Sequence, residues 1–420
     1  MTIADRVSGP SAVSDAVVAG TVVAPAPTAA ASAISLPAVG ERELRLDLFR
    51  GLALWLIFID HLPPSLLTWF TIRNYGFSDA TEIFVFISGY TAAFVYGRAM
   101  RDRGFIVASA RILRRAWQIY VAHIFLFAIF MAEISYVAST FDNPLYAEEM
   151  HILDFLKQPD VTIFQALLLK FKPVNMDVLP LYIVLLLLFP PMLFLLMRAP
   201  AFALAGSALL YVLSWNLDWN LPAYPNGVWF FNPFAWQLLF VFGAWCALGG
   251  AKRLAPVLRS RTVLAVAIAY LIFAFVITLT WYIEPLGRLV PNWLSEWMYP
   301  IDKTNLDVLR FAHFLALAAV TVRFIPRDWP VLKSPLLQPA IRCGQHSLEI
   351  FCLGVFLAFA GQFVISEYSG GPPIQIVISL TGIFIMIAVA NLISWYKAIE
   401  GRSPSSRVRP PDADLAGGEA

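Results

Sequence analysis

Long runs of apolar residues recur along the chain, separated by short polar segments. Many of these runs approach the roughly 20 residues that a helix needs to cross a bilayer. The ten expected segments are 47–66, 79–97, 117–138, 175–197, 200–216, 231–250, 262–282, 308–325, 343–366 and 374–396. Strands of a membrane barrel would alternate apolar and polar residues, whereas these runs are continuous. The pattern predicts an all-α polytopic membrane helix bundle with about ten transmembrane helices.

The polar ends predict the domain organisation. Residues 1–43 mix charged residues with Ala, Val, Pro and Ser and lack the compact apolar core of a secretory signal, so we expect a disordered cytoplasmic tail. Residues 44–396 are expected to form the ten-helix membrane domain. Residues 397–420, rich in Pro, Ser and Arg, predict a second disordered cytoplasmic tail. Within the longest expected outer loops, Val161–Phe171 is expected to form a short interfacial helix.

The distribution of Lys and Arg predicts the orientation. With the N-terminus inside, the inner loops carry more than twice as many Lys and Arg residues as the outer loops. Cytoplasmic loops of membrane proteins show this excess. Both termini are therefore expected in the cytoplasm, which an even number of spans allows.

Composition supports a membrane protein and narrows its partners. The chain is 59% hydrophobic and only 14% charged, whereas soluble domains are about a quarter charged. We therefore expect the lipid bilayer as a partner. The net charge of +2 gives no indication of nucleic-acid binding. Its three cysteines and five histidines show no metal-ligand spacing, so no metal is expected.

The first expected span carries ionisable residues that a simple membrane anchor would lack. Asp47 and Arg50 are spaced to pair on one helix face. His61 lies 11 positions beyond Arg50, which is roughly 16 Å along a helix. Ionisable groups inside a membrane usually mark function. The spacing alone equally allows Asp60 and His61 to cap the helix at the outer interface.

The second expected span begins at Asp79, a candidate N-cap, and places Glu82 one turn inside. Glu82 remains open to a structural or a chemical role. Ser88 and Gly89 are small residues that allow two helices to approach closely, and we prefer packing as their role.

Three arginines precede the third expected span. Arg111 and Arg114 share a helix face and Arg115 lies beside them, an arrangement that suits bidentate binding of phosphates. The alternative is a positively charged anchor at the inner surface. Weaker candidates are Asp177, Arg310, His313, His346 and Glu349. The sequence contains no nucleophile elbow, phosphate-binding loop or dinucleotide fingerprint.

Three of these features together resemble the acyltransferase type-three superfamily of membrane proteins. They are Asp47-x-x-Arg50-Gly51-x-Ala53 leading to His61, Glu82 through Tyr90, and Arg111-x-x-Arg114. The chain is more similar still to the OpgC branch, which succinylates osmoregulated periplasmic glucans. That resemblance runs over 44–396 and includes the segments Gly76–Ala80, Asn175–Tyr182, Phe231–Leu239 and Gly344–Glu349. Gly354 stands where many members of the superfamily have a histidine, so no role is transferred to that helix.

The resemblance implies O-acyl transfer at a bacterial inner membrane. Acyl-CoA, here succinyl-CoA, would be the cytoplasmic donor, with no tightly bound cofactor, and periplasmic glucan the acceptor. Arg50 would lie at the inner mouth, and Arg111, Arg114 and Arg115 would hold the CoA phosphates. His61 would act as general base, oriented by Asp60 or Glu82.

Two alternatives remain open at the level of sequence. Buried His, Asp and Arg residues also suit a proton-coupled transporter of a sugar or lipid, although we find no inverted repeat. The same acyl transfer onto another surface polysaccharide or a lipid is the second alternative. Arg73 or Arg310 is a candidate for binding the succinyl carboxylate.

Overall fold

The structure, a computed structural model, describes residues 43–62, 66–140, 148, 150–367 and 370–400. The two expected tails fall almost entirely outside these residues. Within them, the chain forms helices joined by loops and turns, and no β-strand. The prediction of an all-α protein is therefore confirmed for the described part of the chain.

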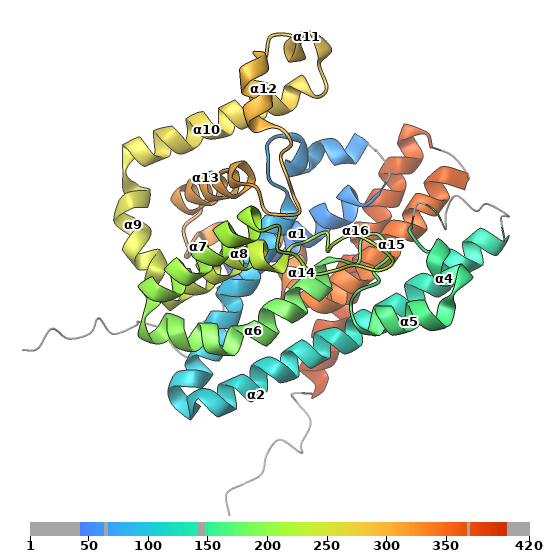
Figure 1. Cartoon of the computed structure of the whole chain (residues 1–420), viewed down its shortest axis with the longest axis horizontal. Helices are drawn as coiled ribbons and strands as arrows, with labels where there is room; N and C mark the ends of the chain where they lie inside the picture. Colours follow the sequence, from blue (N-terminus) through green and yellow to red (C-terminus); the bar gives the residue numbers. More distant parts are fainter. Residues whose placement is uncertain (1–42, 63–65, 141–147, 149, 368–369, 401–420) are drawn as a thin grey trace, which may run out of the picture. The chain divides into compact units, whose positions relative to one another are not determined.

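The helices follow the chain in the order shown in Figure 1. The α-helices are α1 Leu44–Asp60, α2 Ala80–Thr140, α4 Leu153–Lys157, α5 Pro159–Leu167, α6 Val178–Arg198, α7 Pro200–Asn216, α8 Pro233–Trp245, α9 Ala251–Arg259, α10 Arg261–Thr280, α11 Glu284–Gly287, α12 Asn292–Met298, α13 Val308–Phe324, α14 Gln338–Gln345, α15 Ser347–Glu367 and α16 Pro372–Glu400. Short 3-10 helices are η1 Leu66–Phe70, η2 Ile72–Asn74 and η4 Pro330–Lys333, and η3 Cys246–Gly250 is a π-helix that continues α8.

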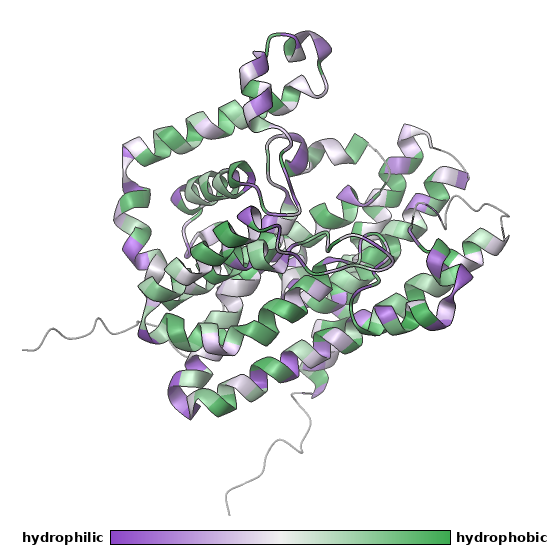
Figure 2. Ribbon diagram, viewed as in Figure 1, coloured by the Kyte–Doolittle hydropathy of each residue, from purple (hydrophilic) through white to green (hydrophobic). Residues whose placement is uncertain are grey.

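The number of spans differs from the sequence-based expectation. Six helices of the described chain are long and apolar enough to cross a membrane, not ten. They are α2, α6, α8 extended through α9, α10, α15 and α16. Figure 2 shows apolar residues along these long helices and hydrophilic residues gathered at helix ends and connections. The expected segments at α1, α7 and α13 form helices of 17 residues each, shorter than the roughly 20 that a straight span needs.

Helix α2 accounts for the rest of the difference, because it contains two expected spans. It runs for 61 residues, but Gly104 has a φ of 82° and breaks the helical backbone. That conformation is open to glycine and strained for other residues. In Figure 1 the ribbon of α2 turns back on itself between two long helical stretches. We refer to residues 80–103 as the first arm of α2 and to 105–140 as the second arm.

Glycines allow two pairs of helices to approach at backbone distance. A Cβ atom on Gly51 of α1 would lie 1.8 Å from the carbonyl oxygen of Ala340 in α14. A Cβ atom on Gly89 of α2 would lie 2.0 Å from the carbonyl oxygen of Phe240 in α8. The packing role preferred for Gly89 is confirmed. These contacts fix α1 and the first arm of α2, which carry three of the expected site residues, Arg50, Asp60 and Glu82.

Two expected helices have different bounds from those predicted. The expected span 343–366 is divided at His346, whose backbone leaves helical geometry between α14 and α15. The expected interfacial helix Val161–Phe171 is present as α5, which ends at Leu167.

Candidate active site

The first turn of α2 is built as a reciprocal cap. The Asp79 carboxylate accepts a hydrogen bond from the backbone N–H of Thr81 at 2.8 Å. The Glu82 carboxylate reaches back and accepts from the backbone N–H of Asp79 at 2.9 Å. This closely resembles a capping box, in which the two side chains satisfy donors that the helix leaves unpaired. The expectation that Asp79 is an N-cap is confirmed, and Glu82 has at least this structural role.

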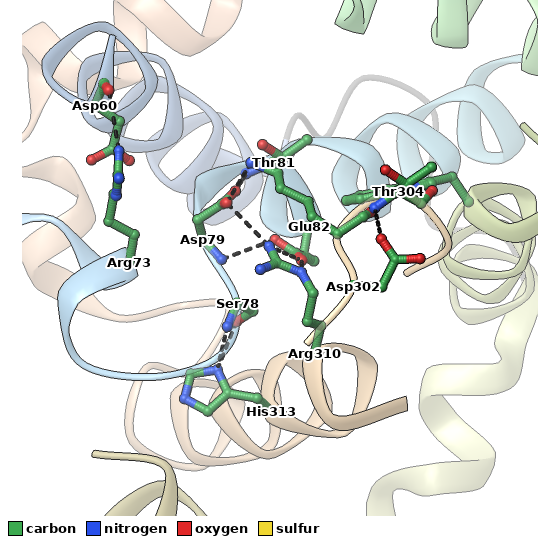
Figure 3. A network of polar contacts seen from close by, with 12 residues as sticks. Asp60, Arg73, Ser78, Asp79, Thr81, Glu82, Asp302, Thr304, Arg310 and His313 are labelled. Atoms are coloured by element: carbon green, nitrogen blue, oxygen red, sulfur yellow. Dashed lines mark hydrogen bonds and ion pairs between the residues drawn. The ribbon is translucent and has the colours of Figure 1, made fainter. Parts of the chain in front are cut away.

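Two cations from a distant segment of the chain bind these carboxylates: Arg310 binds both, and Lys303 binds Asp79. Arg310 of α13 donates its Nε proton to Glu82 Oε1 at 2.9 Å, and its Nη2 lies 3.1 Å from Asp79 Oδ2. Lys303 Nζ lies 2.6 Å from Asp79 Oδ2. We call Asp79, Glu82, Lys303 and Arg310 the charge cluster. Figure 3 shows Arg310 reaching the two carboxylates from below.

The charge cluster is internally neutral and mostly enclosed. Glu82 is fully buried, and the side chain of Arg310 is only 10% exposed. Burial by itself would raise the pKa of Asp79, but Lys303 and then Arg310 hold it well below its usual range. Buried charges are tolerated when they are paired in this way. Arg310 is thus already occupied by carboxylates of the chain.

His313 of α13 holds the loop that precedes α2. The backbone N–H of Ser78 donates to His313 Nδ1 at 3.3 Å, and Ser78 Oγ lies 2.7 Å from the same atom. Because a backbone N–H can only donate, Nδ1 accepts and the ring proton lies on Nε2. A Cβ atom on Gly76 would lie 2.0 Å from that Nε2, so the ring is in close contact with the loop.

His61 follows the last residue of α1 and is half-buried. The Arg73 guanidinium donates to the backbone oxygen of Asp60 at 3.3 Å, which joins the end of α1 to the loop before α2 (Figure 3). Burial, and then the positive charge of Lys303, lower the pKa of His61 to about 4. Among the described residues we find no hydrogen bond from the His61 ring to Asp60 or Glu82. The side-chain atom Oδ1 of Asp60 is buried without a hydrogen-bond partner.

Arg50 of α1 is buried, and its expected pairing with Asp47 is confirmed at 3.9 Å. Its guanidinium also donates to the Ile87 carbonyl at 3.3 Å and to the Thr91 hydroxyl. These contacts join α1 to the first arm of α2.

A cavity of about 210 Å³ lies beside Arg50. Its lining residues are Arg50, Phe84, Ser88, Thr91, Ala92, Val95, Tyr96, Arg115, Leu179, Tyr182, Ser347, Leu348 and Phe351. They come from α1, both arms of α2, α6 and α15. On the first arm the lining runs from Phe84 to Tyr96, or roughly 18 Å of helix axis.

The residues that line this cavity favour an anionic ligand. It contains two guanidinium groups and the hydroxyls of serine, threonine and tyrosine, and no carboxylate. Arginine forks bind phosphate and carboxylate groups with charge-assisted hydrogen bonds. Near its other end, Phe84 stacks on Phe351 with ring centroids 5.9 Å apart. The cavity is therefore cationic in one part and apolar in the other, which suits a charged molecule with a flexible apolar arm.

The three arginines before the third expected span occupy different environments. Arg115 is half-buried and lines the cavity, whereas Arg111 and Arg114 are exposed and are not among its lining residues. Arg111 lies one turn before Arg115, and residues four apart share a helix face. The structure therefore places Arg115 at the cavity, while Arg111 and Arg114 lie on the exposed surface of the same helix.

The sequence did not identify Lys303 as a site residue, and it gave Arg310 only as a weaker candidate. Lys303 lies in a loop, where periodicity gives no information on side-chain partners. One local signal was available: the Asp79-x-x-Glu82 spacing is that of a capping box. Among the described residues, no group of His, Cys, Asp and Glu side chains could hold a metal ion.

The long apolar helices define an α-helical membrane protein, and it contains a cavity lined by two arginines. A family model described as OpgC protein matches residues 42–398. The chain therefore belongs to the OpgC family, and membership indicates an acyltransferase. Neither a curated protein nor a solved structure matches the chain.

Proposed function

We propose that this protein is a transmembrane O-acyltransferase of the bacterial inner membrane. It moves a succinyl group from cytoplasmic acyl-CoA to hydroxyls of a periplasmic glucan. Family membership supports acyl transfer, and the observation that carries the donor is the cavity lined by Arg50 and Arg115. This proposal needs the Arg115 side of the cavity to face the cytoplasm, in agreement with the Lys and Arg bias of the loops.

In this proposal the donor binds in two parts. Arg111, Arg114 and Arg115 bind the CoA phosphates at the cytoplasmic mouth. The pantetheine arm enters the cavity past Arg50 and runs toward Phe84 and the charge cluster. Phe84 lies two residues, about half a helical turn, from Glu82. The reaction would then take place at the opposite end of α1, where His61 lies.

His61 acts as general base in the chemical step. Its imidazole takes the proton of the acceptor hydroxyl while that oxygen bonds to the thioester carbon, and the carbonyl electron pair moves onto oxygen. Collapse of this intermediate breaks the C–S bond, and the imidazolium returns the proton to the leaving CoA thiolate. A low pKa supports this role, because the ring is then neutral at physiological pH.

A carboxylate orients the imidazole, as in other acid–base pairs. Of the two candidates we favour Asp60, because its Oδ1 has no partner among the described residues. Both oxygens of Glu82 are already bound, one by Arg310 and one by the Asp79 N–H. In this proposal Glu82 has a structural role: as part of the charge cluster, it holds the start of α2 against α13.

Mass spectrometry of periplasmic glucans tests the proposal directly. Glucans from a strain that carries the gene should show the succinyl mass increment, and a deletion strain should lose it. His61→Ala should fail to restore the increment although it folds and inserts, whereas the matched variant His151→Ala, in an exposed turn, should restore it. Unmodified glucans in the wild-type strain would show that the acceptor or acyl group is a different one. Full modification with His61→Ala would remove His61 from the mechanism.

A further inference from the structure

The segment between α12 and α13 has a tightly bound backbone. Trp236 of α8 donates its indole proton to the carbonyl oxygens of Lys303 and Thr304, both at 3.1 Å. The Asp302 carboxylate accepts from the backbone N–H of Thr304 at 2.7 Å (Figure 3). Tyr211 of α7 donates to the Leu306 oxygen at 2.9 Å. The backbone of Lys303 is therefore held in place by hydrogen bonds to α7 and α8.

The Lys303 ammonium differs from its cationic neighbour in exposure. The side chain of Lys303 is 31% exposed, compared with 10% for Arg310. Asp79 accepts one hydrogen bond from Nζ at 2.6 Å. An ammonium has three N–H donors, so further donors remain for a ligand in the accessible space. Arg310 is enclosed between two carboxylates, whereas Lys303 can meet a substrate.

Lys303 also lies near the end of the path proposed for the pantetheine arm. Its Nζ is 2.6 Å from Asp79 Oδ2, and Phe84 of the cavity lining is only five residues after Asp79. The positive charge of Lys303 also contributes to the low pKa of His61. In this proposal the ammonium and the imidazole therefore act on the same thioester. When the acceptor oxygen attacks the thioester beside this imidazole, negative charge develops on the carbonyl oxygen. Fixed donors aimed at such a charge often make the largest single contribution to catalysis.

We propose that Lys303 stabilises the negative charge on the thioester oxygen during acyl transfer. This inference rests on the proposed function. As the acceptor oxygen bonds to the carbonyl carbon, the electron pair moves to the carbonyl oxygen, which the ammonium binds without giving up its proton. When the C–S bond breaks, the pair returns to form the ester carbonyl and CoA leaves as the thiolate.

A purely structural role for Lys303 makes a different prediction. In that case the ammonium only neutralises Asp79, and removing both charges together should restore activity. If the ammonium instead acts on the reacting oxygen, Asp79→Asn cannot compensate for its loss. Asn keeps an oxygen that can cap α2, so the double variant D79N/K303M separates the two roles.

The experiment measures kcat and KM in purified protein with succinyl-CoA and periplasmic glucan. Lys303→Met should lower kcat by about 100-fold or more, the typical effect of losing one oxyanion donor. The KM values should stay within about threefold of wild type, because the charge develops only in the transition state. Lys303→Arg should recover part of kcat, and D79N/K303M should recover none. Lys157→Met, at the exposed end of α4, is the matched control and should match wild type.

Two results would overturn the inference: a kcat of K303M within about threefold of wild type, or recovery of kcat in the double variant. Thermal unfolding checks that each variant is folded, and Lys303→Gln carries the test if K303M is not. Wild-type protein that transfers no acyl group would overturn the proposed function, and this inference with it. An active wild type with an equally active K303M would overturn this inference alone.

Discussion

Arg310 of α13 and Glu82 of α2 form a buried ion pair between residues 228 positions apart in the chain, with Nε 2.9 Å from Oε1. The same guanidinium binds Asp79 at 3.1 Å, so one cation serves both carboxylates of the reciprocal cap. The contact ties the beginning of α2 to the beginning of α13. Because the carboxylates are enclosed, water cannot replace the cation if it is removed.

Arg310→Met should therefore destabilise the protein strongly. Breaking a buried pair by removing one partner costs about 3–5 kcal/mol, because the remaining charge is left uncompensated. Glu82→Gln should cost less, since Arg310 keeps Asp79 as a partner. Denaturant unfolding in detergent, followed by circular dichroism, measures both. The matched control is Arg288→Met, which breaks an exposed pair with Glu284 and should cost only about 0–1 kcal/mol. An R310M protein as stable as R288M would contradict the structural role of the pair.

The pH dependence of transfer should report on His61. Its pKa is lowered from 6.5 to about 4 by burial, then by Lys303 and more weakly by Arg73, while Asp79 acts in the opposite direction. A general base acts in its deprotonated form, so kcat/KM should be constant from about pH 8 to about pH 5 and fall to half near pH 4. A pH profile of acyl transfer at saturating acceptor checks this. An acid limb near pH 6.5 would indicate a solvated imidazole and contradict the site described above.

Local spacing along single helices could be predicted well from the sequence. Asp47 and Arg50 pair as their i, i+3 spacing requires, and Gly89 meets the backbone of a neighbouring helix as a small residue in an apolar run suggests. The first property follows from the helix period and the second from residue size. The same period placed Arg115 beside Arg111 and Arg114, but could not tell that Arg115 is the one that lines the cavity.

Contacts between distant segments could not be predicted. Lys303 and Asp79 meet across 224 residues, from a loop without periodic structure. The span count was wrong because three of the expected spans, at α1, α7 and α13, form helices of only 17 residues, and two others are joined in α2. Helix ends were also misjudged: α1 stops at Asp60 rather than at 66, and the backbone at His346 interrupts an apolar run that looks continuous. Which helix pairs approach closely depends on tertiary packing that one sequence does not encode in any short pattern.

Arg115→Ala should weaken binding of acyl-CoA more than Arg114→Ala or Arg111→Ala does. Arg115 lines the cavity, so its loss removes charge-assisted hydrogen bonds from an enclosed site, each of which contributes about 1.5–3 kcal/mol. The expected rise in KM for the donor is about tenfold to hundredfold. Arg111 and Arg114 are exposed, so salt and water screen their attraction for the CoA phosphates. Their loss should therefore raise KM less.

Steady-state kinetics with varied acyl-CoA and titration of CoA itself measure these effects. Arg103→Ala, at the exposed end of the first arm, is the matched control because it removes the same charge away from the cavity. Raising the salt concentration should weaken the contribution of Arg111 and Arg114 more than that of Arg115. Equal KM values for R115A and R103A would exclude the cavity as the donor site.

Gly51→Ala should damage the protein although it adds only one methyl group. The new Cβ atom would lie 1.8 Å from the backbone oxygen of Ala340, so α1 and α14 would have to move apart. The shift would displace Arg50, one residue away, from Ile87 and from the cavity. We expect a lower melting temperature and a loss of acyl transfer together. Gly206→Ala in α7 is the control, because its Cβ atom meets nothing within 4 Å and Ala favours a helix by about 0.5–1 kcal/mol. If G51A unfolds at the same temperature as G206A, the close approach of α1 and α14 is not needed for stability, and any remaining loss of activity must come from Arg50 alone.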